Sequence, residues 1–239
     1  AKSMDPDLAR NLPRRTFQQA RPEGGDLLML CPSCHLNHQT LVRRAEEEAR
    51  IGGAMELPRF PRVKQLLEVL AFDLGPEEIK KKVRRPLRGL RVLPYYGCLV
   101  VRPFGLGGKE SLENPLAMER LIEAAGGEAI SIPERIDCCG GGILMTREKT
   151  ALKLGAALFR RARVHSPDCL AVVCPLCHFM LDAKQRAMER ETGERIRLPV
   201  LYLTQILGFA LGLDPAELSW SRVITSPFNL LSRIGGEDR

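Results

Sequence analysis

The stretch Asp168-Cys169-Leu170-Ala171-Val172-Val173-Cys174-Pro175-Leu176-Cys177-His178 decides the fold of this chain. Its first part, 168–173, is a short apolar run that is typical of a buried β-strand. Proline is favoured in the first turn of a helix, so we expect a helix over about 176–192, closed by Gly193. The stretch therefore predicts a strand that leads through a Cys-Pro-x-Cys-His motif into a helix.

The same order of features occurs near the start of the chain. Residues 26–30 form a short apolar run, and Cys31-Pro32-Ser33-Cys34-His35 then leads into a charged helical stretch through Arg50. Both segments predict a strand, the same cysteine motif and a helix. Self-similarity of this kind indicates an internal duplication.

The remaining sequence alternates predicted strands with predicted helices. We expect strands at 90–96, 128–132 and 198–202, and helices at about 62–72, 114–126, 146–164 and 204–211. Asn114 and Thr146 are expected to cap the helices that they begin. The alternation predicts an α/β fold with a largely parallel sheet, in which ligand-binding groups collect at the carboxyl ends of the strands.

Charge and hydropathy exclude several classes of protein. The net charge is +7, but only 5% of the residues are aromatic, and no basic cluster is interleaved with stacking groups, so a nucleic-acid role is not indicated. The basic segments 80–85 and 160–163 are expected to be solvated, and they are compatible with an acidic partner or an anionic substrate. No uninterrupted apolar run reaches the roughly 18 to 20 residues of a membrane span.

The cellular compartment bears on how the cysteines are interpreted. The first thirty residues contain no apolar segment of the secretory type, so we expect a cytoplasmic protein. The cytoplasm keeps thiols reduced. The eight cysteines are therefore better explained as metal ligands or reactive groups than as four disulfides.

Five of the eight cysteines form an ordered set, Cys98, Cys138, Cys139, Cys174 and Cys177. Several of them follow predicted strands, so we expect the set to meet at one edge of the sheet. A structural zinc ion is closed by four ligands, and histidines with zinc-finger spacing are absent. Iron–sulfur chemistry fits the set better than zinc does. Cys169 is expected to be a buried strand cysteine.

The residues around the adjacent cysteine pair add a second clue. Gly140, Gly141 and Gly142 lack a Cβ, so the main chain can approach a cofactor and aim N–H groups at it. Arg135, Arg147 and Lys149 flank the pair, and we expect them to serve solubility at the surface ahead of charge compensation.

Five segments together resemble the B subunit of heterodisulfide reductase, a member of the CCG cysteine-rich family. They are Tyr95-Tyr96-Gly97-Cys98-Leu99-Val100-Val101-Arg102-Pro103, Glu113-Asn114-Pro115, Asp137-Cys138-Cys139-Gly140-Gly141-Gly142, Cys174-Pro175-Leu176-Cys177 and Pro199-Val200-Leu201-Tyr202-Leu203-Thr204-Gln205-Ile206-Leu207-Gly208. The resemblance implies two pseudo-repeated CCG domains with short, mostly parallel sheets flanked by helices. Residues 1–88 would hold the remainder of the first domain and a linker, and residues 89–239 the complete second domain.

The same resemblance implies an oxidoreductase that acts on sulfur groups, as CoB-CoM heterodisulfide reductase does. A noncubane [4Fe–4S] cluster would be held by Cys98, Cys138, Cys139, Cys174 and Cys177, beside Gly140, Gly141 and Gly142. Cys31 and Cys34 would be metal ligands of a second site that is only partly present, so we expect the N-terminal segment to be truncated or to be supplied by another chain. A disulfide would be reduced to two thiols.

Electrons must come from partner chains, because no ferredoxin-type cysteine run and no dinucleotide-binding fingerprint occurs in the sequence. The resemblance implies two such partners, a ferredoxin-like C subunit and a flavin-bearing A subunit. Two alternatives stay open. One is a CCG-type electron-transfer subunit of a quinone-linked dehydrogenase or a sulfur-oxidation complex, and the other is a structural zinc module, for which Cys31, Cys34, His35 and His38 are candidate ligands.

Overall fold

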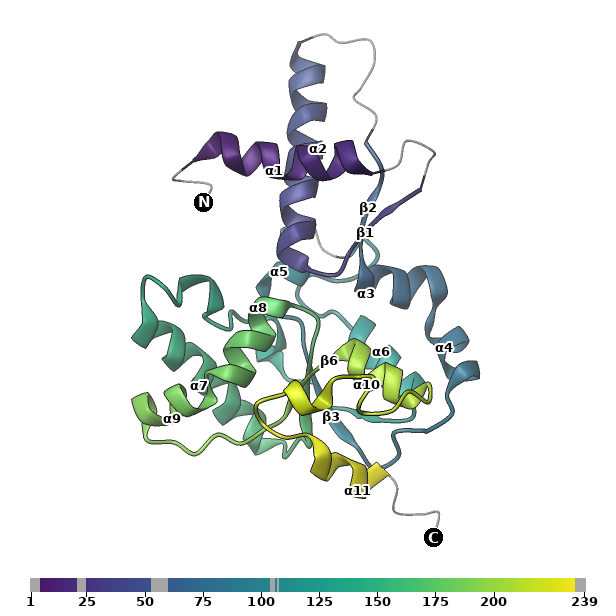
Figure 1. Ribbon diagram of the computed structural model, residues 1–239, viewed down its shortest axis with the longest axis vertical. Helices are drawn as coiled ribbons and strands as arrows, with labels where there is room; N and C mark the ends of the chain where they lie inside the picture. The colour runs from purple at the N-terminus through teal and green to yellow at the C-terminus, as the bar shows by residue number, and fades with distance from the viewer. Residues whose placement is uncertain (1–4, 21–24, 53–59, 104–105, 107, 235–239) are drawn as a thin grey trace. The chain divides into compact units, whose positions relative to one another are not determined.

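The computed structural model describes residues 5–20, 25–52, 60–103, 106 and 108–234 (Figure 1). The chain divides into two compact units, Ala1–Leu66 and Leu67–Arg239. Each unit is built from parallel strands and helices.

The described residues of the first unit form two helices and a pair of strands. Helix α1 (Pro6–Gln19) begins after Asp5, whose side chain accepts a hydrogen bond of 2.8 Å from the Leu8 N–H. Strand β1 (Leu27–Met29) pairs in parallel with β2 (Val63–Gln65), and α2 (Pro32–Ile51) lies between them in the chain. The helix predicted over 62–72 is therefore wrong at its start. Val63 and Gln65 are buried on one side of β2 and Lys64 pairs with Asp26 at 2.6 Å, an alternation that suits a strand.

The second unit contains a four-stranded sheet in the order β4-β3-β5-β6. Its strands are β3 (Arg91–Tyr95), β4 (Glu128–Ala129), β5 (Cys169–Val172) and β6 (Val200–Tyr202). Every neighbouring pair is parallel. The predicted α/β fold with short parallel sheets flanked by helices is confirmed.

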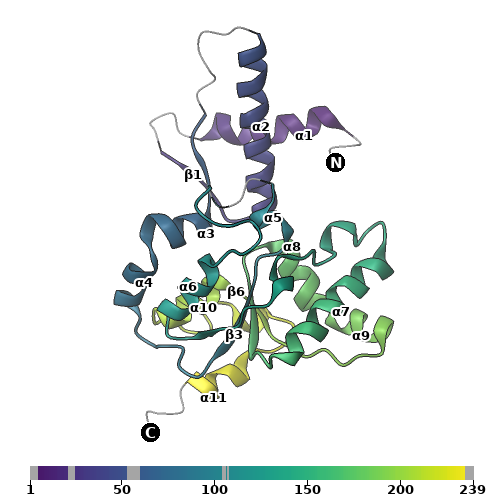
Figure 2. The same cartoon turned by 180° about the vertical axis from the view of Figure 1, so that it is seen from behind.

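Helices cover both faces of this sheet (Figures 1 and 2). One face packs against α4 (Pro76–Lys82), α6 (Ala117–Ala124) and α10 (Leu203–Ala210), and the other against α7 (Glu148–Val164) and α9 (Gln185–Thr192). The central strand β5 is buried on both sides, with Cys169 and Ala171 in one core and Leu170 and Val172 in the other. This continuous apolar strand is what a covered parallel sheet requires. The prediction that Cys169 is a buried strand cysteine is confirmed.

Short helices and turns complete the chain. They are α3 (Leu66–Glu68), α5 (Cys98–Val101), α8 (Pro175–His178), α11 (Leu231–Ile234), the π-helical turns η1 (Val69–Leu74) and η4 (Phe179–Ala183), and the 3-10 turns η2 (Pro133–Ile136), η3 (Gly141–Ile143), η5 (Trp220–Arg222) and η6 (Phe228–Leu230). The single helix predicted over 176–192 is thus divided into α8, η4 and α9, and it ends as expected at Gly193, which has φ 73°.

Both predicted helix caps are wrong. Helix α6 begins at Ala117, and the Asn114 side chain instead accepts a hydrogen bond from the Arg135 guanidinium. Helix α7 begins at Glu148, and the Thr146 hydroxyl donates to the Ile143 carbonyl at 3.3 Å. Each polar side chain has found a partner outside the helix, which composition alone does not reveal.

Candidate metal centre

The five cysteines of the ordered set lie together at the carboxyl edge of the sheet. Cys98 follows β3, Cys174 follows β5, and Cys138 and Cys139 lie on the loop after η2. The thiol of Cys98 is hydrogen-bonded to that of Cys138, and the thiol of Cys177 contacts those of both Cys139 and Cys174. The thiols from three separate loops thus form a contacting pair, Cys98 and Cys138, and a contacting set of three, and Cys98 also interacts electrostatically with Cys139.

The thiols differ in acidity because their surroundings differ. The contact with the Cys177 thiol lowers the pKa of Cys174 to about 6 and also lowers the pKa of Cys139. The same contacts, together with burial, raise the pKa of Cys177. Burial and the neighbouring Cys138 and Cys139 raise the pKa of Cys98 to about 11. A lowered pKa at Cys174 favours the thiolate, the form that binds metals.

Two backbone N–H groups point at sulfur atoms of the adjacent pair. The Gly140 N–H donates to Cys138 Sγ and the Gly141 N–H to Cys139 Sγ, both at 3.4 Å. Gly140 has φ 84°, and a Cβ there would lie 2.6 Å from the Ala151 carbonyl oxygen. Only glycine fits this position. A Cβ on Gly142 would meet no atom within 4 Å, so the third glycine is not required for space.

Gly97 is a further glycine requirement that was not identified from the sequence. It has φ 64°, and a Cβ there would lie 2.9 Å from Cys177 Sγ. The main chain before Cys98 therefore passes directly against the sulfur group. The adjacent Tyr95 is buried and donates to the Asp137 carbonyl at 2.6 Å, and burial together with the nearby thiols raises the pKa of its phenol. The signal in the sequence that could have predicted this close approach is the glycine directly before Cys98.

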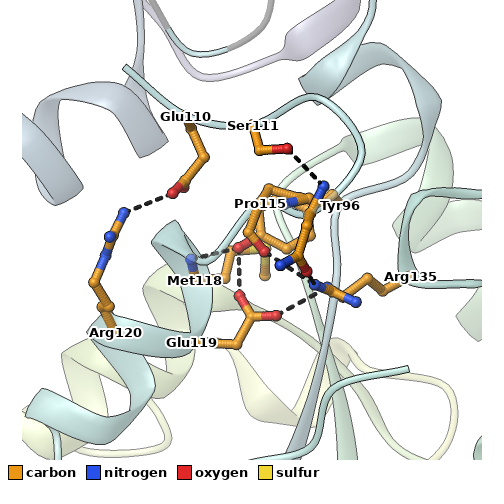
Figure 3. Close-up of polar contacts among 9 residues, drawn as sticks. Tyr96, Glu110, Ser111, Pro115, Met118, Glu119, Arg120 and Arg135 are labelled. Atoms are coloured by element: carbon orange, nitrogen blue, oxygen red, sulfur yellow. Dashed lines mark hydrogen bonds and ion pairs between the residues drawn. The ribbon is translucent and has the colours of Figure 1, made fainter. Parts of the chain in front are cut away.

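Arg135 is buried, which corrects the surface role expected from the sequence. Its side chain is in ion-pair contact with Glu119, with 3.0 Å between Nε and Oε1, and it donates to the Ile132 carbonyl at 2.7 Å. Glu119 also accepts a hydrogen bond from the Tyr96 hydroxyl (Figure 3). Burial raises the pKa of Glu119, and these two contacts oppose that rise. A buried polar network thus lies beside the cysteine loops.

In the first unit, Cys31 and Cys34 flank the start of α2. Cys31 is the residue before its first turn, and the Cys34 carbonyl accepts a hydrogen bond of 2.8 Å from Nδ1 of His38. His35 is buried beside Gln65, with 3.2 Å between Nδ1 and Nε2, and burial lowers the pKa of His35. One ring nitrogen of His38 is therefore engaged with the Cys34 carbonyl, whereas its Nε2 is buried without a hydrogen-bond partner among the described residues.

Within the part of the chain that the structure describes, no three or more His, Cys, Asp or Glu side chains form a group that could hold a metal ion. The five thiols instead contact one another as a pair, Cys98 and Cys138, and as a set of three around Cys177. Their chemistry nevertheless fits an iron–sulfur cluster, because soft sulfur ligands, N–H donors to sulfur and a main chain without Cβ atoms meet at one place.

A pocket of about 210 Å³ lies elsewhere in the second unit, lined by residues that include Phe159, Arg163 and Ile196. Pro167 and Leu198 also line this pocket, and they precede β5 and β6, whereas the cysteine loops follow the carboxyl ends of the strands. It is not part of the candidate metal centre.

Among the described residues, no helix combines the length and the apolar character that crossing a bilayer requires.

Comparison with known proteins identifies the family. The model of the CCG cysteine-rich domain matches residues 92–182. The 8-methylmenaquinol:fumarate reductase membrane anchor subunit of Wolinella succinogenes is 31% identical over 229 residues, which cover 91% of this chain and 78% of that protein. The chain belongs to the CCG cysteine-rich family.

Other relatives of this CCG protein include subunits of heterodisulfide reductases. The B subunit of the Ferredoxin/F(420)H(2)-dependent CoB-CoM heterodisulfide reductase of Methanosarcina acetivorans is 27% identical and aligns over 98% of this chain and 81% of that protein. A hypothetical protein from Helicobacter pylori has a similar fold, with a TM-score of 0.53 at 11% identity, and the match covers 82% of this chain and 35% of that one. The resemblance to the B subunit of heterodisulfide reductase is confirmed.

Proposed function

We propose that this CCG protein is the iron–sulfur catalytic subunit of a heterodisulfide-reductase-like complex. A noncubane [4Fe–4S] cluster would be held by Cys98, Cys138, Cys139, Cys174 and Cys177. The observation that carries this proposal is the convergence of all five thiols at one sheet edge, with two backbone N–H groups directed at sulfur.

The chain's own groups supply binding and charge balance at this site. The bound cluster supplies one-electron chemistry that ordinary side chains lack. The N–H groups of Gly140 and Gly141 stabilise negative charge on the sulfur ligands, and the low pKa of Cys174 favours its ligating form. Reduction of a disulfide consumes two electrons and two protons and yields two thiols.

The proposal includes partners and a location. The relatives are named as subunits of a fumarate reductase and of heterodisulfide reductases, which supports assembly with other chains. We place a ferredoxin-like C subunit and a flavin-bearing A subunit beside this chain, in the cytoplasm, as donors of the electrons. Cys31 and Cys34 are proposed as ligands of a second site in domain 1–88, and residues 89–239 as the second CCG domain.

A second candidate function has a specific observation in its favour. The Wolinella relative, at 31% identity, is named for a menaquinol:fumarate reductase and not for disulfide chemistry. In that case the same cluster would pass electrons between a quinol-linked enzyme and its partner without cleaving a disulfide.

Anaerobic purification followed by two assays separates the candidates. Iron and sulfide analysis with paramagnetic resonance tests for the cluster, and zinc analysis tests the structural alternative. Purified complex is then assayed with CoB-CoM heterodisulfide and with a reduced menaquinone analogue. Thiol release from the heterodisulfide supports the first function, whereas quinol oxidation without thiol release supports the second and contradicts the first.

A further inference from the structure

The buried network around Arg135 connects two of the three cysteine loops. Arg135 lies in η2, three positions before Cys138, and its carbonyl oxygen accepts hydrogen bonds from the N–H groups of Tyr96 and Gly97, at 2.9 and 3.1 Å. Tyr96 and Gly97 directly precede Cys98. The backbone of one residue therefore ties the Cys98 loop to the loop of the adjacent pair.

The side chain of Arg135 holds that residue from the other side. Its guanidinium donates to the Ile132 carbonyl at 2.7 Å, to the Pro115 carbonyl at 3.3 Å and to the Asn114 side chain. These contacts are made by Nη1 and Nη2, while Nε faces Glu119. Because the fork of an arginine is planar and rigid, several simultaneous bonds fix both its position and its orientation.

Glu119 closes the network back to the Cys98 loop. Its second carboxylate oxygen accepts a hydrogen bond from the hydroxyl of Tyr96, which itself accepts one from the Met118 N–H at 2.8 Å (Figure 3). Covalent and polar links thus run from Cys98 through Tyr96, Glu119 and Arg135 to Cys138. The hydrogen-bond contact between the Cys98 and Cys138 thiols closes this path into a ring.

Stability alone is a poor reason for this arrangement. The side chains of Arg135 and Glu119 are 5% and 6% exposed, and burying two charges costs free energy that apolar residues of similar size would not incur. Hydrogen bonds are directional, so those made by Arg135 favour one separation between the Cys98 loop and the loop of the adjacent pair.

We propose that Arg135 is a positioning residue that sets the separation of the Cys98 and Cys138 thiols, with Glu119, itself hydrogen-bonded to Tyr96, holding its guanidinium. The proposal deepens the proposed function, since these thiols are ligands of the cluster. Its first test needs no cluster, so that its failure can be told apart from failure of the iron–sulfur assignment.

The first test measures cross-linking of Cys98 to Cys138 by dibromobimane in the cluster-free chain of 239 residues, with the products identified by mass spectrometry. Arg135→Lys keeps the charge but loses the fork, and Glu119→Gln keeps the shape but loses the ion pair. Arg161→Met is the matched control, because Arg161 makes an exposed ion pair of 2.5 Å with Glu134, the neighbour of Arg135. We expect cross-linking to slow on the order of tenfold in the first two variants and to be unchanged in the control.

Circular dichroism shows whether each variant is folded. Unchanged cross-linking in folded Arg135→Lys or Glu119→Gln would overturn the proposal, and so would an equal decrease in Arg161→Met. If Arg135→Lys does not fold, the result for the nearly isosteric Glu119→Gln decides. In the iron-loaded chain, paramagnetic spectra should change in Arg135→Lys and match wild type in Arg161→Met. Absence of any cluster would contradict the proposed function and leave the cross-linking result standing.

Discussion

The two Cys-Pro-x-Cys-His motifs have nearly the same local structure. Cys31 and Cys174 both precede a helix in extended conformation, with φ −116° and ψ 119° for the first and φ −99° and ψ 123° for the second. In each case the N–H of the histidine donates to the carbonyl of the first cysteine, at 3.0 Å for His35 and 2.9 Å for His178. The motif therefore determines its own turn from strand to helix.

The surroundings of the two histidines are also parallel. Burial lowers the pKa of both histidines. Each ring is also hydrogen-bonded to the backbone of the next strand, at Val63 for His35 and at Val200 for His178. The neighbouring side chain differs. Gln65 contacts His35, whereas the ring of Tyr202 stacks on His178 with 4.3 Å between centroids.

The decisive difference lies outside the motifs. Around Cys174 and Cys177, loops from β3 and η2 bring Cys98, Cys138 and Cys139, whereas the unit Ala1–Leu66 contains Cys31 and Cys34 as its cysteines. A Cys-Pro-x-Cys-His motif thus prepares two ligands, and separate loops of the second unit bring three further thiols to Cys174 and Cys177.

The largest expected effect comes from breaking the five-thiol set. We predict that Cys139→Ser removes or converts the cluster, because a serine oxygen is a poor substitute for a soft thiolate on iron. Cys34→Ser should leave that cluster intact, which would sharpen the difference between the two motifs. Iron, sulfide and paramagnetic spectra of anaerobically prepared variants provide the measurement. Cys169→Ser is the control for loss of a buried thiol, and wild-type spectra in Cys139→Ser would refute the ligand assignment.

A second prediction concerns the glycine main chain beside the second motif. Gly140→Ala places a Cβ 2.6 Å from the Ala151 carbonyl oxygen at φ 84°, so we expect it to lower the free energy of unfolding by about 2 to 4 kcal/mol. The matched control is Gly142→Ala, where a Cβ meets no atom within 4 Å. Urea denaturation of the cluster-free chain measures both. Equal stability of the two variants would show that the glycine pair is not constrained as described.

The smallest effect is expected where the two histidines differ. Tyr202→Gln gives the second motif the neighbour that Gln65 provides in the first, and it removes the ring stacked on His178. We expect a loss of about 1 kcal/mol in the free energy of unfolding, which is typical of one aromatic contact. The cluster spectra should not change. A change in spectra as large as that caused by Cys139→Ser would mean that His178 and Tyr202 act on the cluster itself.

Much of the second unit could be predicted from sequence because its elements have local signals. The apolar run before Cys174, the proline after it and Gly193 identify strand, helix start and helix end without tertiary information. Convergence of the five cysteines followed from the rule that parallel strands end at one edge.

The features that were not predicted depend on distant partners. Arg135 looks like any surface arginine in the sequence, and only its contacts with Asn114 and Glu119 reveal that it is buried. The strand at Val63 was missed for a different reason. Residues 63–75 repeat the pattern of 200–212, with Phe72 matching Phe209 and Gly75 matching Gly212, and that repeat would have placed a strand at Val63 to match the one at Val200.

The iron content of the chain tests the central claim most directly, namely that the five thiols around Cys174 and Cys177 hold one cluster without Cys31 and Cys34. The anaerobically reconstituted chain of 239 residues should bind about four irons, as one [4Fe–4S] cluster requires, and Cys31→Ser with Cys34→Ser should not change that number. About eight irons per chain, or loss of iron from the Cys31→Ser and Cys34→Ser double variant, would contradict it.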